Sequence, residues 1–131
     1  MATDLYRAAR DASAKAHAPY SNYPVGAAIR TASGAIFAGA NIENVSSPEG
    51  WCAETSAIAL MVMAGESEIA EVCVFAARAA RATPCGGCRQ RLMEFGTAST
   101  KVHLCDGEGI ADTVALGDLL PAAFDIEEAT G

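Results

Sequence analysis

The chain has 131 residues, of which 51% are apolar and 19% charged, with a formal net charge of −7. This length predicts one domain over 1–131 that can bury a core without disulfide support. The acidic excess argues against a nucleic-acid ligand, because Lys and Arg normally neutralise the phosphates. No apolar run reaches the ~18 residues that cross a bilayer, and MATDLYRAAR lacks the apolar stretch of a secretory signal. We therefore expect a cytoplasmic protein without nucleic-acid or membrane partners.

Periodicity and turn signals predict strands that alternate with helices after an initial hairpin. In chain order, the predicted elements are a helix over 5–16, strands over 25–30 and 36–41, a helix over 53–64, a strand over 72–77, a helix over 84–95, a strand over 101–105 and a helical segment over 116–124. The second helix and the third strand are almost wholly apolar, so both should be central. This order predicts a mixed sheet between helical layers, and the fold class is α/β.

Two short motifs concentrate the chemistry of the chain, CAE at 52–54 and PCGGC at 84–88. Five cysteines is an odd number, and in a reducing compartment such spacing favours metal binding or catalysis over disulfides. Cys85 and Cys88 are three residues apart and share one side of a helix, whose first turn stabilises thiolates. If a second helix begins at Cys52 and faces the first, Cys52 and Glu54 can both reach the same metal.

Three interpretations of these cysteines compete. A redox-active dithiol needs neither a third thiol nor a carboxylate. A structural zinc site normally closes with four protein ligands, but the spare thiols Cys73 and Cys105 lie in predicted apolar strands, where a free Cys usually packs in the core. Three thiolates that leave one position open, next to a carboxylate, are typical of a catalytic zinc site.

Five runs appear in a fixed order between about Leu5 and Phe124: APYSNYPVGAAI, NIEN, CAE, PCGGCRQRLMEFG and LLPAAF. In combination they resemble the small zinc-dependent cytidine deaminases in their three-cysteine form. The resemblance implies a three-layer α/β/α sandwich with a mixed five-stranded sheet. It also implies hydrolytic deamination of cytidine and 2′-deoxycytidine in pyrimidine salvage, by a homotetramer whose sites are completed by neighbouring subunits.

The same resemblance implies roles for individual residues. Cys52, Cys85 and Cys88 would hold one Zn²⁺ per subunit, with a water in the fourth position. Glu54 would be the catalytic acid and base that moves protons from this water to N3 and the leaving amine of cytosine. The implied substrate-binding residues are Asn41 and Glu43 at the ribose, Tyr23 at the base, Ala53, and Phe124, which would reach the site of a neighbouring subunit.

One departure from the family pattern concerns charge. Thr55 stands where the family usually has an Arg that hydrogen-bonds the zinc thiolates. Three thiolates with Zn²⁺ leave one net negative charge, which disfavours ionisation of the bound water. We expect weaker activation of water unless Arg89, another Arg or the helix dipoles compensate.

Two other departures concern the substrate. The loop at 45–51 lacks the aromatic residue common at Ser47 and has Glu49 and Trp51 where aliphatic residues are usual, and Tyr23 replaces Phe. Deamination of a modified cytosine nucleoside or a nucleoside antibiotic is therefore an alternative function. A non-catalytic zinc-binding module is the alternative outside enzymes, and the two classes differ in whether Glu54 is needed for activity.

Overall fold

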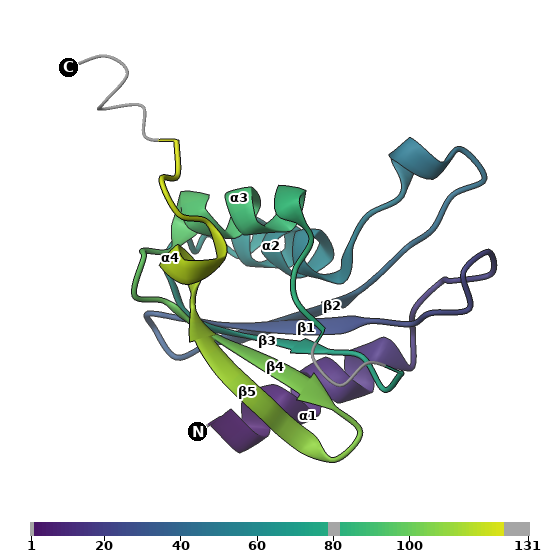
Figure 1. Cartoon of the computed structure of the whole chain (residues 1–131), viewed down its shortest axis with the longest axis horizontal. Helices are drawn as coiled ribbons and strands as arrows, with labels where there is room; N and C mark the ends of the chain where they lie inside the picture. The colour runs from purple at the N-terminus through teal and green to yellow at the C-terminus, as the bar shows by residue number, and fades with distance from the viewer. Residues whose placement is uncertain (1, 79–81, 125–131) are drawn as a thin grey trace.

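The computed structural model describes residues 2–78 and 82–124 (Figure 1). Its elements are α1 (Ala2–Ser13), β1 (Gly26–Thr31), β2 (Ile36–Ala40), a short 3-10 turn η1 (Ser47–Glu49), α2 (Ala53–Met63), β3 (Ile69–Phe75), α3 (Gly86–Phe95), β4 (Lys101–Asp106), β5 (Gly109–Ala115) and α4 (Leu116–Leu119). The strands form a sheet in the order β2-β1-β3-β4-β5, whose β3–β4 pair is parallel and whose other pairs are antiparallel.

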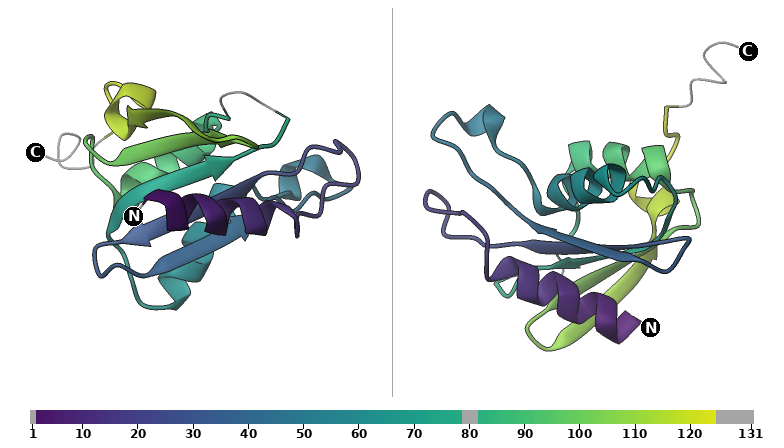
Figure 2. Two further views of the ribbon diagram at one scale, coloured as in Figure 1. Left: turned by 90° about the horizontal axis from the view of Figure 1, so that it is seen from below. Right: turned by 180° about the vertical axis from the view of Figure 1, so that it is seen from behind.

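Helices cover both faces of this sheet. Helix α1 lies across one face, and α2 and α3 lie on the other (Figure 1, Figure 2). We call these the α1 face and the α2–α3 face. The predicted three-layer α/β/α sandwich with a mixed five-stranded sheet is confirmed. Within the described residues, no helix is long and apolar enough to cross a bilayer.

The central strands contribute to a separate core on each face, because successive side chains of a strand point to opposite sides. The α2–α3 face buries Ile29, Ala57, Met61, Val72, Val74, Leu92, Val102 and Leu104. The α1 face buries Leu5, Ala9, Ala28, Cys73, Phe75 and Cys105. The sulfurs of Cys73 and Cys105 lie 2.8 Å apart inside this second core. The prediction that these two cysteines are packing residues is confirmed.

The C-terminal part of the described chain differs from the strand and helix predictions. The helical segment predicted over 116–124 is the single turn α4, and Leu120 has already left the helix with φ −139°. Pro121 explains this end, since proline lacks an N–H group and disfavours helical backbone in the preceding residue. Periodicity also missed β5, which is an edge strand with polar and partly exposed side chains. The fifth strand was expected only from the family resemblance.

A chain of polar side chains crosses the α1 face from α1 to β5. Arg30 on β1 contacts Asp4 of α1 at 2.6 Å and Glu71 of β3 at 2.9 Å. The other oxygen of Glu71 lies 2.7 Å from Nε2 of His103 on β4, and Nδ1 of His103 lies 2.8 Å from the Thr113 hydroxyl on β5. These contacts satisfy polar groups that would otherwise be costly to bury between the strands.

Glu71 should make the stability of the fold sensitive to acid. Burial opposes its ionisation, but hydrogen bonds from His103 and Arg30 outweigh burial and hold the carboxyl pKa below its ordinary value of 4.5. A lowered pKa stabilises the fold above pH 4.5, and this contribution is lost as the pH falls below that value. Glu71→Gln should therefore lower the free energy of unfolding at pH 7 by about 1–2 kcal/mol and flatten its decline in acid. Thermal unfolding followed by circular dichroism from pH 7 to pH 3 measures both effects.

The control for this experiment is Glu68→Gln, which neutralises an exposed carboxylate just before the same strand. It should leave the acid limb of the stability curve unchanged. If Glu71→Gln showed the same decline as the parent chain, Glu71 would not be the group responsible.

Candidate functional site

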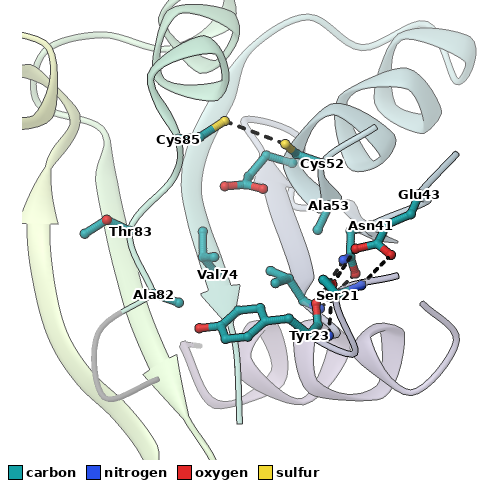
Figure 3. Close-up of a pocket in the computed structure, with 12 residues that line it drawn as sticks. Ser21, Tyr23, Asn41, Glu43, Cys52, Ala53, Val74, Ala82, Thr83 and Cys85 are labelled. Carbon is teal, nitrogen blue, oxygen red and sulfur yellow. Dashed lines mark hydrogen bonds between the residues drawn. The ribbon is translucent and has the colours of Figure 1, made fainter. Parts of the chain in front are cut away.

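The N-termini of α2 and α3 bring three cysteines together. Cys52 is the N-cap of α2 and Cys85 is the N-cap of α3, each with extended backbone, and Cys88 lies in the first turn of α3. The three Sγ atoms lie within 4.8 Å of one another. Figure 3 shows the thiols of Cys52 and Cys85 pointing toward each other. The arrangement predicted from the spacing, two facing helix N-termini, is confirmed.

The sulfur positions fit a tetrahedral zinc ion. The Sγ atoms of Cys52 and Cys85 are 3.6 Å apart, and two thiolates on tetrahedral zinc, at Zn–S about 2.3 Å, are separated by about 3.8 Å. Within the described residues, no further His, Cys, Asp or Glu belongs to this cluster. Three protein ligands leave one coordination position open, as in catalytic rather than structural zinc sites.

The surroundings of the three thiols are unequal. Burial raises the pKa of Cys52 and of Cys88. Partial desolvation also acts to raise the pKa of Cys85, but a hydrogen bond from the backbone N–H of Cys88 and the contact with the Cys52 thiol outweigh it, and the pKa of Cys85 is lowered. Because zinc binds thiolates, metal binding must also supply the free energy that deprotonates the two more buried thiols.

Glu54 lies in the first turn of α2 and is only 4% exposed. Burial raises the pKa of its carboxyl, while a backbone hydrogen bond, the positive charge of Arg91 and a hydrogen bond from Cys88 act in the opposite direction. A carboxyl with a raised pKa, held away from bulk water beside a metal site, is suited to accept and release protons during a reaction.

A cavity of about 550 Å³ adjoins these groups, a volume typical of small-molecule sites. The predicted site residues that line it are Tyr23, Asn41, Glu43, Cys52, Ala53, Glu54 and Cys85 (Figure 3). Cys88 is buried and does not line this cavity. Phe124 is 69% exposed and does not line the cavity within one subunit.

The cavity is also lined by five residues that the sequence analysis does not predict: Ser21, Val25, Val74, Ala82 and Thr83. Ser21 and Val25 lie within the run APYSNYPVGAAI and could have been found from its resemblance to the family. Val74 has no such signal, because its position depends on which face of β3 meets the cavity.

Glu43 is held by the loop that precedes β1. One carboxylate oxygen accepts hydrogen bonds from the backbone N–H groups of Tyr20 and Ser21, at 2.9 and 3.1 Å. The other oxygen accepts a hydrogen bond from the Ser21 hydroxyl. The Ser21 hydroxyl is the main cause that lowers the pKa of Glu43, with the two backbone bonds adding to it against partial desolvation. Glu43 is therefore a carboxylate of fixed orientation at the edge of the cavity.

Asn41 is fixed by the same loop. Its Oδ1 accepts a hydrogen bond from the N–H of Val25 at 2.9 Å, and its Nδ2 donates one to the carbonyl of Tyr23 at 3.0 Å. A side-chain amide has two donors and two acceptor lone pairs, so one donor and one acceptor remain for a ligand.

Arg89, one of the groups named as a possible replacement for the family's Arg at position 55, does not point to the thiols. Thr55 places its hydroxyl 3.6 Å from the sulfur of Cys88. Arg89 instead donates from Nε to the carbonyl of Pro84 at 2.7 Å and from Nη1 to the carbonyl of Leu119 at 3.0 Å. Arg89 therefore connects the loop before α3 to α4, and its guanidinium is directed to backbone carbonyls rather than to the thiols.

Comparison with known proteins agrees with this geometry. Residues 1–104 match the family model described as "Cytidine and deoxycytidylate deaminase zinc-binding region". The cytidine deaminase of Halalkalibacterium halodurans is 36% identical over 124 residues, covering 95% of this chain and 94% of the relative. That of Mycoplasma genitalium is 40% identical over 111 residues, covering 84% and 85%.

A solved structure is also similar over nearly the whole chain. The crystal structure of cytidine deaminase from Burkholderia pseudomallei superposes with a TM-score of 0.89 at 39% identity, covering 95% of this chain and 99% of the other. Sequence, fold and the cluster of three thiols lead to one assignment: the chain belongs to the zinc-binding cytidine and deoxycytidylate deaminase family.

Proposed function

We propose that this chain is a zinc-dependent aminohydrolase that converts cytidine and 2′-deoxycytidine, with one water, to uridine and 2′-deoxyuridine plus ammonia. The observation that carries this proposal is the buried carboxyl of Glu54 beside three thiols at a cavity of nucleoside size. Cys52, Cys85 and Cys88 are the proposed ligands of the zinc ion. When bound, the metal supplies the Lewis acidity that makes a water nucleophilic at neutral pH.

Glu54 performs the proton transfers in this proposal. Its carboxylate accepts a proton from the attacking water and delivers it to N3 of the cytosine ring, which makes C4 electrophilic. A second proton moves by way of the same carboxyl to the departing amine, so that ammonia leaves and the C4 carbonyl of uridine forms. The burial of Glu54 restricts proton exchange with bulk water during these steps.

Asn41 and Glu43 bind the ribose, and Tyr23 and Ala53 contact the base. Asn41, Glu43, Ala53 and Cys52 line the same cavity (Figure 3). The amide of Asn41 keeps one donor and one acceptor, and the carboxylate of Glu43 keeps acceptor capacity beyond its three bonds to the loop. These groups complement a pair of sugar hydroxyls.

A homotetramer of this chain accounts for its exposed apolar side chains. Leu60 and Met63 on α2 are 53% and 84% exposed, and Trp51 and Val45 project from the loop that contains η1. Large exposed apolar groups of this kind mark interaction surfaces, and the proposed occupant is a second copy of the chain. In this assembly Phe124 completes the cavity of a neighbour. The whole chain is then one catalytic domain of a cytoplasmic pyrimidine-salvage enzyme.

Glu54→Gln tests whether the zinc site is catalytic. Loss of the proton carrier should reduce deamination of cytidine by about 10²–10⁴-fold, while zinc content should stay the same because Glu54 is not a ligand. The ultraviolet spectral change of cytidine measures activity, and elemental analysis of the same sample measures zinc. Cys85→Ser is the comparison variant and should lose both. Full activity of Glu54→Gln, or its loss of zinc, would contradict the assigned role.

Glu43→Gln tests ribose recognition. Loss of the anionic acceptor should raise the KM for cytidine by about tenfold or more, since hydrogen bonds to charged groups contribute roughly 1.5–3 kcal/mol. Steady-state kinetics with cytidine, 2′-deoxycytidine, free cytosine and modified analogues measures this change and the substrate range. Ser21→Ala is the matched control, because it removes one anchor of Glu43 but keeps the carboxylate. Equal KM changes in both variants would mean that Glu43 acts only by ordering the loop.

Replacing Leu60 and Met63 together by Glu tests the assembly. The parent chain should elute with four times the mass of one chain, and the double variant should dissociate because charged side chains are costly to bury in an apolar interface. Light scattering after size exclusion measures the mass, and activity should fall with dissociation. A fully active monomeric parent chain would refute the homotetramer.

A further inference from the structure

With zinc bound, the thiol cluster would carry an excess of negative charge beyond what the neutral groups around it offset. Three thiolates with one Zn²⁺ carry a net charge of −1, Glu54 lies beside them, and the chain as a whole is acidic. Groups around the ligands commonly supply hydrogen bonds and charge of this kind. Thr55 offers only a neutral hydroxyl, and Arg89 is bonded to the carbonyls of Pro84 and Leu119.

Among the described residues, Arg91 directs its guanidinium at the cluster. It lies three residues after Cys88 on the same side of α3, and its Nη1 is 3.9 Å from the sulfur of Cys88. Gly87 leaves the space for this contact, because a Cβ atom at Gly87 would lie 3.1 Å from the same Nη1. The guanidinium thus lies along the first turn of α3 and next to the most buried of the three thiols.

Arg91 reaches the cysteines from outside the substrate cavity. It lines a second cavity of about 390 Å³, together with Glu49, Trp51 and Thr55. Cys52 is the one residue that lines both this cavity and the substrate cavity. Arg91 can therefore act on the thiolates without touching a nucleoside.

We infer that Arg91 is the positioning residue that balances the negative charge of the zinc thiolates through Cys88, in place of the Arg that is absent at position 55. The inference rests on the proposed zinc ligands. Its consequence is that the charge of Arg91 serves to retain the metal, whereas Arg89, two residues earlier on the same helix, serves to hold the backbone.

The test compares Arg91→Ala with Arg91→Lys and with the double variant Thr55→Arg, Arg91→Ala. Zinc release from the purified protein to 4-(2-pyridylazo)resorcinol, a chromogenic chelator, is the main readout. Arg91→Ala should release zinc about 10–100-fold faster, since losing a group that supports a metal ligand typically lowers metal affinity by that factor. Arg91→Lys should keep part of the retention. The double variant should restore it, because position 55 reaches the same sulfur.

Further readouts separate this role from a structural one. The KM for cytidine should be unchanged in Arg91→Ala while kcat falls, and the melting temperature of the metal-free protein should equal that of the parent. Arg7→Ala removes an exposed positive charge from α1, on the other face of the sheet, and should release zinc at the parent rate. Glu49→Gln should also release zinc at the parent rate. Faster release from Glu49→Gln would mean that Arg91 acts by pairing with Glu49.

Release of zinc from Arg91→Ala at the parent rate overturns the inference, as does equal acceleration in Arg7→Ala or in Glu49→Gln. The zinc content of Cys85→Ser shows whether a negative result concerns Arg91 alone or the proposed zinc ligands. If Cys85→Ser retained zinc, the proposed ligand set would be wrong, whatever the behaviour of Arg91.

Discussion

The convergence of two helix N-termini is the constraint on which the rest of this structure depends. Cys52 and Cys85 are both N-caps, so each thiol lies at the end of a helix where backbone N–H groups are free and the dipole is positive. The distance between the two thiols is set by how α2 and α3 pack on the sheet. Met61 of α2 and Leu92 of α3 share one buried core, and this apolar packing holds the ligands in place.

The substrate side of the site follows from the strand register. Gly26 of β1 pairs with Ala40 of β2 on one side and with Phe75 of β3 on the other. The start of β1 and the ends of β2 and β3 therefore lie at one edge of the sheet. Asn41 directly follows β2 and can reach the N–H of Val25, directly before β1. Because the strands end together, the loop before β1, the residues after β2 that are proposed to bind the ribose, and residues 82 and 83 before α3 line one cavity at this edge.

Features that depend on neighbouring residues could be predicted from the sequence, whereas features that depend on tertiary packing could not. The metal motifs and the start of α2 could be predicted, because caps and CXXC spacing involve only neighbouring residues. Helix α3 begins at Gly86, two residues after the predicted start at Pro84. The extent of α4 and the presence of β5 could not be read from periodicity, since one depends on a proline and the other on an exposed edge. Arg89 and Arg91 are two positions apart, about 200° around a helix. Which of them faces the thiols depends on how α3 is rotated against the sheet.

The alternation of side chains along β3 and β4 separates Cys73 and Cys105 from the three cysteines of the site. On β3, Val74 lines the substrate cavity, so the adjacent Cys73 must point to the α1 face, where it packs with Cys105. His103 on β4 shares that face and bonds to Glu71. Cys73, His103 and Cys105, the potential further zinc ligands in these strands, therefore lie on the side of the sheet away from the thiol cluster. A register shift of one residue would exchange the two faces. The pleat of the central strands thus keeps the zinc site at three thiolates, which leaves the open position that catalysis requires.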